Sequence, residues 1–150
     1  MYSPGKILYF DPFYFKNGNT SKPKYFIVLH NDHSNTILAS LPTRTDHVPS
    51  YVEIKHGCIN KDEANFNCYH FEAKKPIATN GWAFEMPTFV YGSQVDNYQL
   101  DILKDVYQVE NVEYSIMGSL KKDEFKKLIE CFVNSRSVKR KFKALLQAHL

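Results

Sequence analysis

Short apolar runs separated by turn-forming residues make up the first two thirds of the chain, from residue 5 to residue 95. Each run is rich in β-branched or aromatic side chains, which favour strands. Repeated short strands with turn signals between them are typical of a small antiparallel β-sheet or barrel. The predicted strands cover residues 6–10, 25–30, 36–41, 51–54, 69–72, 81–84 and 88–94.

The apolar spacing changes to a helical period after residue 97. Leu100, Leu103 and Val106 lie three apart and predict a short helix, and a strand-like run follows over residues 111–118. Two further helices are predicted, the longer one after Ser119. Its apolar stripe comprises Leu120, Phe125, Leu128, Ile129, Phe132 and Val133.

The second of these helices is expected to begin after Ser137, because serine is a favourable helix cap. The length of 150 residues suits a single domain, and no linker divides it. We therefore expect one domain over residues 1–150, with mostly barrel strands over 1–97 and a mostly helical extension over 98–150. The fold class is mainly β (α+β).

The composition fits a globular protein, with 43% hydrophobic and 23% charged residues. No apolar run reaches the roughly 18 residues that span a bilayer, and the start of the chain lacks the pattern of a signal peptide. We therefore expect a cytoplasmic protein without membrane contact. The three cysteines are an odd count, which favours free thiols in a reducing compartment over a disulfide framework.

Charge is unevenly distributed along the chain. Residues 1–120 hold 10 Lys or Arg against 13 Asp or Glu, whereas residues 121–150 hold 9 against 3, so the net +3 is the sum of −3 and +6. A basic tail attracts polyanions such as nucleic acid. The alternative is a solvated helix face.

Candidate chemistry must come from loose groupings, because the chain carries no glycine-rich phosphate loop, GxSxG elbow, HExxH or CxxC motif. Lys22 and Lys24 flank Pro23, where a long polar loop meets the predicted strand 25–30. Two lysines at a boundary between loop and sheet could clamp a phosphodiester. The alternative, which composition alone favours, is that they only keep the loop soluble.

A denser polar group follows the third predicted strand. Within five positions the chain carries Thr43, Arg44, Thr45, Asp46 and His47. Arginine binds phosphate with two parallel hydrogen bonds, a threonine hydroxyl bonds a phosphate oxygen, and histidine titrates near neutral pH. The alternative is a polar turn in which Thr45 or Asp46 satisfies backbone donors.

A mirrored pair of motifs raises the question of zinc. His56 and Cys58 are separated by one residue, as are Cys68 and His70, and alternate residues of a strand share one face. Two antiparallel strands could bring the four side chains together as tetrahedral ligands. Structural zinc sites usually use tighter cysteine knuckles, so half-buried strand residues are the favoured interpretation.

The succession of these segments resembles the PemK/MazF toxins of bacterial type II toxin–antitoxin systems. The resembling pieces are GKILYFDPF, KPKYFIVL, LASLPTRT, HVPSYVEI and TFVYGSQV, in that order. The similarity is strongest over residues 5–54 and weakest over residues 55–87. It implies a small SH3-like antiparallel β-barrel (MazF/PemK/CcdB-like) with C-terminal helices.

The resemblance also implies a function, namely an endoribonuclease that cuts single-stranded RNA without a metal or other cofactor. It implies a homodimer that is silenced by a cognate antitoxin. Catalysis would fall to Lys24, Thr43, Thr45 and Arg44, and substrate binding to Lys22, Asp46, His47 and Gln94.

The chain departs from the family pattern at Lys24, which stands where the family has an arginine. Lysine lacks the planar guanidinium fork, which Arg44 could supply instead. Two alternatives to a nuclease remain. One is a non-catalytic, toxin-like binding module that inhibits a protein partner, and the other is a zinc-stabilised nucleic-acid-binding adaptor.

Overall fold

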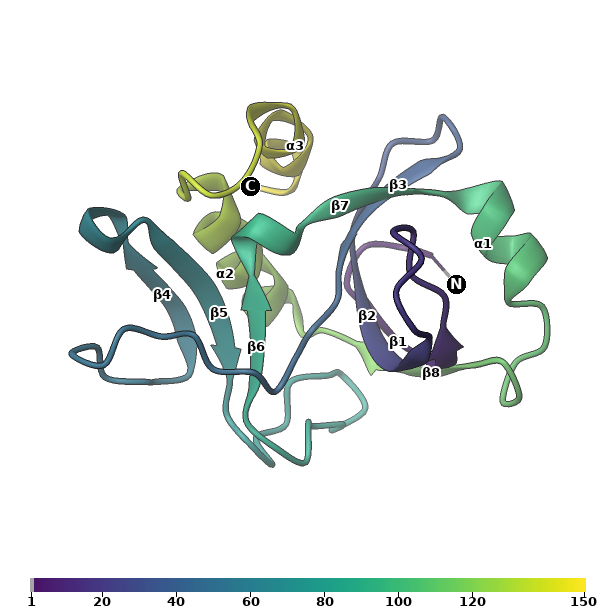
Figure 1. Ribbon diagram of the computed structural model, residues 1–150, viewed down its shortest axis with the longest axis horizontal. Coiled ribbons are helices and arrows are strands. Elements are labelled where there is room, and N and C mark those ends of the chain that lie inside the picture. The colour runs from purple at the N-terminus through teal and green to yellow at the C-terminus, as the bar shows by residue number, and fades with distance from the viewer. Residues whose placement is uncertain (1) are drawn as a thin grey trace.

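The computed structural model describes residues 2–150 and has an α+β fold with mostly antiparallel strands in two sheets (Figure 1). The larger sheet has the strand order β7-β3-β2-β1-β8. The smaller sheet has the order β4-β5-β6. The strands are β1 (Lys6–Phe13), β2 (Lys22–Asn31), β3 (Thr36–Ser40), β4 (Gly57–Lys61), β5 (Phe66–Phe71), β6 (Thr88–Tyr91), β7 (Asp96–Gln99) and β8 (Tyr114–Ser119).

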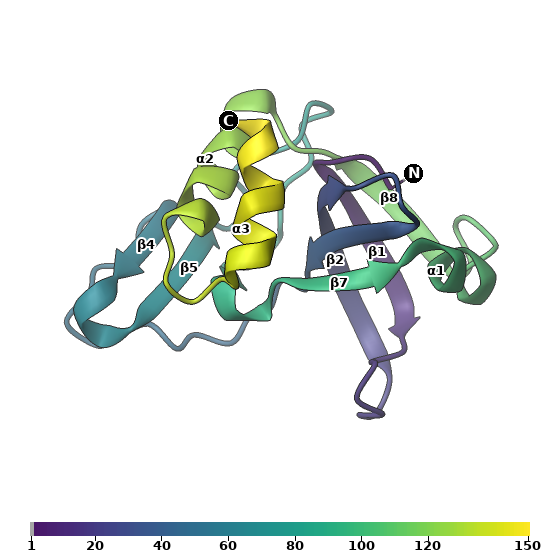
Figure 2. The same cartoon turned by 90° about the horizontal axis from the view of Figure 1, so that it is seen from above.

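Three α-helices accompany the sheets, together with three short 3₁₀ turns. Figure 2 shows α2 and α3 beside the smaller sheet and α1 at the opposite end of the molecule. No helix within residues 2–150 is long and apolar enough to cross a membrane. The helices are α1 (Leu100–Val106), α2 (Lys122–Val133) and α3 (Arg140–Leu146), and the turns are η1 (Asp62–Ala64), η2 (Gly92–Gln94) and η3 (Gln147–His149).

The central hairpin of β1 and β2 is buried on both faces. Ile7 pairs with Ile27 and Leu8 with Phe26, and all four side chains are fully buried. Ile7 and Ile27 pack in a core shared with β5 and α2, whereas Leu8 and Phe26 pack in an aromatic core below α1. This two-sided burial explains why both strands are continuous apolar runs rather than alternating ones.

The expected closed barrel is not found among residues 2–150. The strands separate into the two sheets where the chain leaves β3, and β7 and β8 lie at opposite ends of the larger sheet. Thr43 then forms an isolated bridge to Phe89 of β6. The two sheets are therefore joined by a crossing segment, residues 41–47, rather than by continuous strand pairing.

Two predicted strands are wrong, and two strands were missed. Residues 51–54 form a turn and extended coil in which Tyr51 is 66% exposed, and residues 81–84 form a loop. Their β-branched and aromatic side chains gave a strand-like pattern, but neither segment has a strand to pair with. The missed strands β4 and β7 are short and polar, and they exist because β5 and β3 provide partners.

The predicted helices are confirmed, but their predicted caps are wrong. Ser119 ends β8, and Lys121 occupies the N-cap position of α2. Ser137 likewise precedes the N-cap of α3, which is Lys139. The helix α2 buries Leu128, Ile129, Cys131 and Phe132.

The expectation of free thiols is also wrong for two of the three cysteines. Cys58 of β4 and Cys131 of α2 form a disulfide, with a Cα–Cα distance of 5.5 Å, and Cys68 remains a buried free thiol. An odd number of cysteines is also compatible with one disulfide and one free thiol, and this is what the structure has. The disulfide fastens the outer strand of the smaller sheet to the helix that covers it.

We expect reduction of this disulfide to lower the free energy of unfolding by about 2–4 kcal/mol, because the crosslink restricts the unfolded chain. The bridged residues are 73 positions apart. Urea denaturation with and without dithiothreitol measures the change, and the Cys58→Ala/Cys131→Ala variant should not respond to the reductant. Thiol titration of the unfolded, unreduced protein should find Cys68 alone; three reactive thiols would contradict the assignment.

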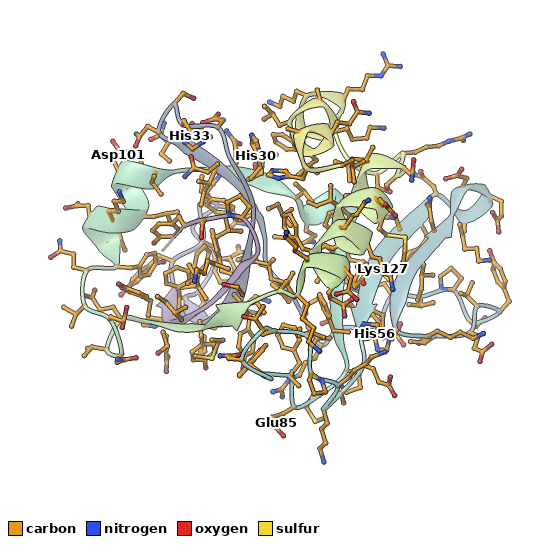
Figure 3. All side chains as sticks on the ribbon, turned by 180° about the vertical axis from the view of Figure 1, so that it is seen from behind. His30, His33, His56, Glu85, Asp101 and Lys127 are labelled. Carbon is orange, nitrogen blue, oxygen red and sulfur yellow. A yellow bond between two sulfur atoms is a disulfide. The ribbon has the colours of Figure 1, made fainter. Side chains whose placement is uncertain are left out.

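A histidine pair fastens the C-terminal end of the chain to the larger sheet. Nε2 of His149 in η3 lies 2.7 Å from Nδ1 of His30 in β2, and the His149 ring also contacts Phe125. Burial lowers the pKa of both imidazoles, and the charge of His30 lowers the pKa of His149 further. Asp32 raises the pKa of His30 and His33 lowers it, and Lys141 faces the same hollow. Figure 3 labels His30 and His33.

Docking of the C-terminal end should therefore weaken in acid. Because the folded pKa of each histidine lies below its unfolded value of about 6.5, the pair contributes stability above that pH and loses it as the pH falls. We expect the melting temperature of the wild type to fall more than that of His30→Gln/His149→Gln between about pH 7 and pH 5. Burial also lowers the pKa of His70. Because His70 is present in both proteins, its contribution cancels in the comparison. Parallel pH profiles would disprove the role of the pair.

Candidate functional site

Two clefts lie on either side of a shared wall where the two sheets meet. The wall consists of Lys22, Lys24, Thr43 and Thr45, which line both clefts. The polar cleft, of about 490 Å³, also receives His47 and Gln94. The aromatic cleft, of about 370 Å³, is completed by Tyr9, Pro23, Tyr25, Pro42, Arg44, Phe84, Glu85, Met86 and Thr88.

Most of the predicted site residues are thus brought together, although they come from three separate segments. Lys22 and Lys24 are two apart at the start of β2, where alternate residues share a face. Thr43, Arg44, Thr45 and His47 belong to the crossing segment, and Gln94 lies in η2 after β6. The residue types were recognisable in sequence, but their proximity depends on how the two sheets are joined.

Backbone hydrogen bonds hold the crossing segment against β6. The Thr43 amide donates to the Phe89 carbonyl at 2.9 Å, and the Phe89 amide donates to the Thr43 carbonyl at 2.7 Å. The Thr45 amide donates to the Thr43 hydroxyl oxygen at 3.2 Å, and the two hydroxyls lie 3.3 Å apart. Both threonine hydroxyls are thereby positioned along the shared wall.

Folding shifts the pKa of Lys24. Burial lowers the pKa of its ammonium group, and the positive charge of Lys22 lowers it further. No salt bridge found within residues 2–150 involves either lysine. Two neighbouring cations that form no salt bridge beside a cleft make a site that a bound anion would stabilise.

Arg44 is exposed and lies in the aromatic cleft near the phenol of Tyr25. Burial raises the pKa of Tyr25, and the Arg44 charge opposes that shift. Glu85, labelled at the lower margin of the molecule in Figure 3, also lines this cleft and raises the Tyr25 pKa. The aromatic cleft therefore contains charges of both signs.

Asp46, which the resemblance assigned to substrate binding, does not line either cleft. Its carboxylate accepts a hydrogen bond of 2.8 Å from the Val48 amide. This is the alternative interpretation of a polar turn, in which a short side chain satisfies a backbone donor. The turn directs His47 toward the polar cleft.

Tyr91 is the residue of the site that sequence reasoning missed. Its buried hydroxyl accepts a hydrogen bond of 2.9 Å from the His47 amide and donates to the Thr45 carbonyl. The tyrosine ring lies 5.6 Å from the imidazole of His47. The pattern of residues 88–94 predicted a strand here, but it gave no sign that the phenol would reach a segment 44 residues earlier in the chain.

Aromatic side chains of the second cleft were also missed as site residues. Tyr25 packs on Tyr9 at 4.9 Å between ring centroids and on Phe84 at 5.0 Å. Met86 is exposed beside them. An aromatic surface next to cations is suited to stacking an unpaired base whose phosphate contacts the cations.

The zinc alternative is contradicted by the register of β4 and β5. Cys58 pairs with Tyr69, and Ile59 pairs with Cys68, so the two cysteines point to opposite faces of the sheet. Cys58 is also bonded to Cys131. Within residues 2–150 no group of three or more His, Cys, Asp or Glu side chains could hold a metal ion.

His56 has a structural partner instead. Its Nε2 lies 3.0 Å from a carboxylate oxygen of Glu124 in α2, and the Tyr69 hydroxyl donates to the same carboxylate. Burial raises the pKa of Glu124, but the hydrogen bonds from His56 and Tyr69 outweigh it, and the net pKa is lowered. The cluster joins the smaller sheet to α2.

The molecule is thus a small α+β protein with two antiparallel sheets. The polar and the aromatic cleft, which share the wall of Lys22, Lys24, Thr43 and Thr45, are together called the double cleft. No protein-family model matches the chain, and no curated protein matches it either.

We expect Tyr91→Phe to loosen the crossing segment without unfolding the protein. The change removes the acceptor of the His47 amide, and a lost hydrogen bond of this kind costs about 1 kcal/mol. Exchange of the His47 amide hydrogen should then accelerate roughly fivefold, as measured by hydrogen exchange. Tyr98→Phe, at an equally buried tyrosine of β7, is the matched control. Equal exchange in both variants would show that Tyr91 does not hold the segment.

Proposed function

We propose that the double cleft binds single-stranded RNA and that the chain is a PemK/MazF-like toxin with endoribonuclease activity. The observation that carries the proposal is the gathering of two lysines, an arginine and two threonine hydroxyls, from separate segments, around one wall. The sequence resemblance independently points to the same residues. Such a set matches the oxygens and the charge of a phosphodiester.

The two clefts suggest how a strand would lie. A phosphate held at the shared wall by Lys24 and the Thr43 hydroxyl would leave its flanking nucleotides in the polar and the aromatic cleft. The aromatic cleft offers Tyr9 and Tyr25 for stacking, and the polar cleft offers Gln94 for hydrogen bonds to a base edge. Single-stranded RNA is favoured because its bases are free to enter such clefts.

The proposed reaction is attack by a ribose 2′-hydroxyl on the adjacent phosphorus. The 2′-oxygen forms a bond to phosphorus while the bond to the 5′-oxygen breaks, giving a cyclic phosphate and a free 5′-hydroxyl. His47 moves the proton between the attacking and the leaving oxygen. Lys24 and Arg44 stabilise the negative charge of the pentavalent transition state, and a threonine hydroxyl bonds a non-bridging oxygen. Only RNA carries the required nucleophile.

The expected partners extend the proposal. As a toxin, the chain would form a homodimer and be silenced by a cognate antitoxin. The end of the molecule that carries α2 and α3, with most of the excess positive charge, would add sequence-independent affinity for RNA.

A second candidate is a non-catalytic module that binds a protein through the same clefts. Glu85 and the exposed Met86 favour it, because a carboxylate repels a polyanion and an exposed methionine suits a protein surface. An RNA adaptor without catalytic activity is the remaining alternative.

Cleavage of a long single-stranded RNA in the presence of a chelator tests the proposal directly. The proposed nuclease cleaves and leaves 2′,3′-cyclic phosphate ends, whereas a DNA strand of the same sequence is not cut. Binding of RNA without cleavage would favour the adaptor, and neither binding nor cleavage would favour the protein-binding module.

Lys24→Ala should reduce turnover more than removal of the C-terminal cations. A donor positioned on developing charge is worth about 10²–10³-fold in turnover, whereas Lys139, Arg140, Lys141 and Lys143 would bind ground state and transition state equally and affect mainly KM. The two variants are compared on one RNA at two salt concentrations, with Lys104→Ala on α1 as the control. If Lys24→Ala turns over RNA normally while the variant that lacks the four C-terminal cations is inactive, Lys24 is not part of the catalytic site.

A further inference from the structure

An apolar groove runs along α1, at the end of the molecule opposite α2 and α3 (Figure 2). This α1 groove has a volume of about 440 Å³ and is lined mainly by Phe13, Tyr14, Tyr98, Ile102, Val106 and Tyr107. Tyr14 is 59% exposed and Ile102 54%. In the loop after α1, Val109 and Val112 are exposed as well. Large apolar side chains gathered at one place on a surface mark an interaction site.

Carboxylates border this apolar surface. Residues 96–113 contain five Asp or Glu and a single Lys. Because an α-helix turns about 100° per residue, Asp101 and Asp105 form a row directly beside Ile102 and Val106, and Lys104 lies on the far side of that row. No salt bridge found within residues 2–150 reaches Asp101 or Asp105. Figure 3 shows Asp101 at the outer end of α1.

The groove is not arranged to receive an added strand. Its floor includes β7, which is an edge strand. The Lys16 ammonium donates to the Asn97 carbonyl of β7, pairs with Asp96 at 3.2 Å and lies 4.2 Å from the centre of the Tyr98 ring. A lysine that occupies an edge carbonyl opposes strand addition. A helix that lays an apolar face in the groove leaves this contact intact.

We propose that the α1 groove binds a cationic amphipathic helix of another protein. The apolar face of that helix covers Ile102, Val106 and Tyr14, and its Lys or Arg side chains pair with Asp101 and Asp105. The occupant is not the basic C-terminal helix of a second copy, because the apolar residues Phe142 and Leu146 of α3 are already buried in the chain's own core. The site is separate from the double cleft and does not depend on the proposed nuclease function.

The test uses the full-length protein and a fluorescent peptide of about 14 residues, built from Leu and Lys to form an amphipathic helix. Fluorescence anisotropy should show saturable binding that weakens with salt. A Leu/Glu peptide of the same pattern should bind at least about tenfold more weakly, because its charges oppose Asp101 and Asp105.

Variants locate the binding. Asp101→Asn/Asp105→Asn should weaken binding about tenfold at low salt, because two ion pairs with the peptide are lost. Ile102→Ser should weaken binding by a similar factor, and at high salt also. Glu63→Gln/Glu130→Gln removes two exposed carboxylates elsewhere and should bind as wild type. All substituted side chains are exposed, so circular dichroism should show unchanged folding.

Unchanged binding in both groove variants would overturn the proposal, as would equal affinity for the two peptides. Light scattering measures whether the protein is a monomer or a dimer. If the protein is a dimer that Ile102→Ser converts to a monomer, a second copy covers the groove and the proposed partner helix is wrong. Failure of RNA cleavage would leave this result untouched, because the peptide assay does not involve the double cleft.

Discussion

The two hydrogen bonds between Thr43 and Phe89 are the constraint on which the candidate site depends. They are made where the chain has left the larger sheet and has not yet begun the smaller one. By fixing residue 43 beside β6, they bring the crossing segment within reach of Tyr91, whose phenol then holds Thr45 and His47. The lysines at the start of β2 face the same seam. A single closed barrel would bury this junction, whereas two sheets with a short link leave an open cleft on either side of it.

The rest of the fold holds the two sheets together at this junction. The core that contains Ile27 of the larger sheet also contains Tyr69 of the smaller sheet and Phe132 of α2, so one core joins both sheets and this helix. The disulfide fastens β4 to that helix, and the cluster of His56 and Glu124 fastens it at a second point. Negative and positive side chains lie in different parts of the molecule. Carboxylates predominate around α1 and cations around α2 and α3, with the cationic cleft on the seam between the sheets.

What could be predicted from the sequence was the local part of the structure. The continuous apolar runs of β1 and β2, the strand β8 and the apolar face of α2 were found because their own residues carry the signal. The strands β4 and β7 were not among the predicted apolar runs, because GCINK and DNYQ are strands only by virtue of their partners. The disulfide, the opposite faces of Cys58 and Cys68, and the division of the strands into two sheets were missed for the same reason. Pairing and register are long-range properties, and a one-residue shift moves a side chain to the other face.

The residues of the candidate site also fall into those that the sequence revealed and those that only the fold revealed. The cationic and hydroxyl groups were recognised from their chemistry, but the phenol of Tyr91 and the aromatic cleft were not, because aromatic residues in a strand pattern normally indicate core. The electrostatic argument for the proposed anion site could come only from the fold. Folding half-buries Lys24 beside Lys22, and within residues 2–150 neither lysine forms a salt bridge, so burial and the Lys22 charge lower the Lys24 pKa. An anion in either cleft would reverse both effects, since it returns a counter-charge to the two ammonium groups. An arrangement that is unfavourable for the empty protein and favourable for its complex is what an anion-binding site requires.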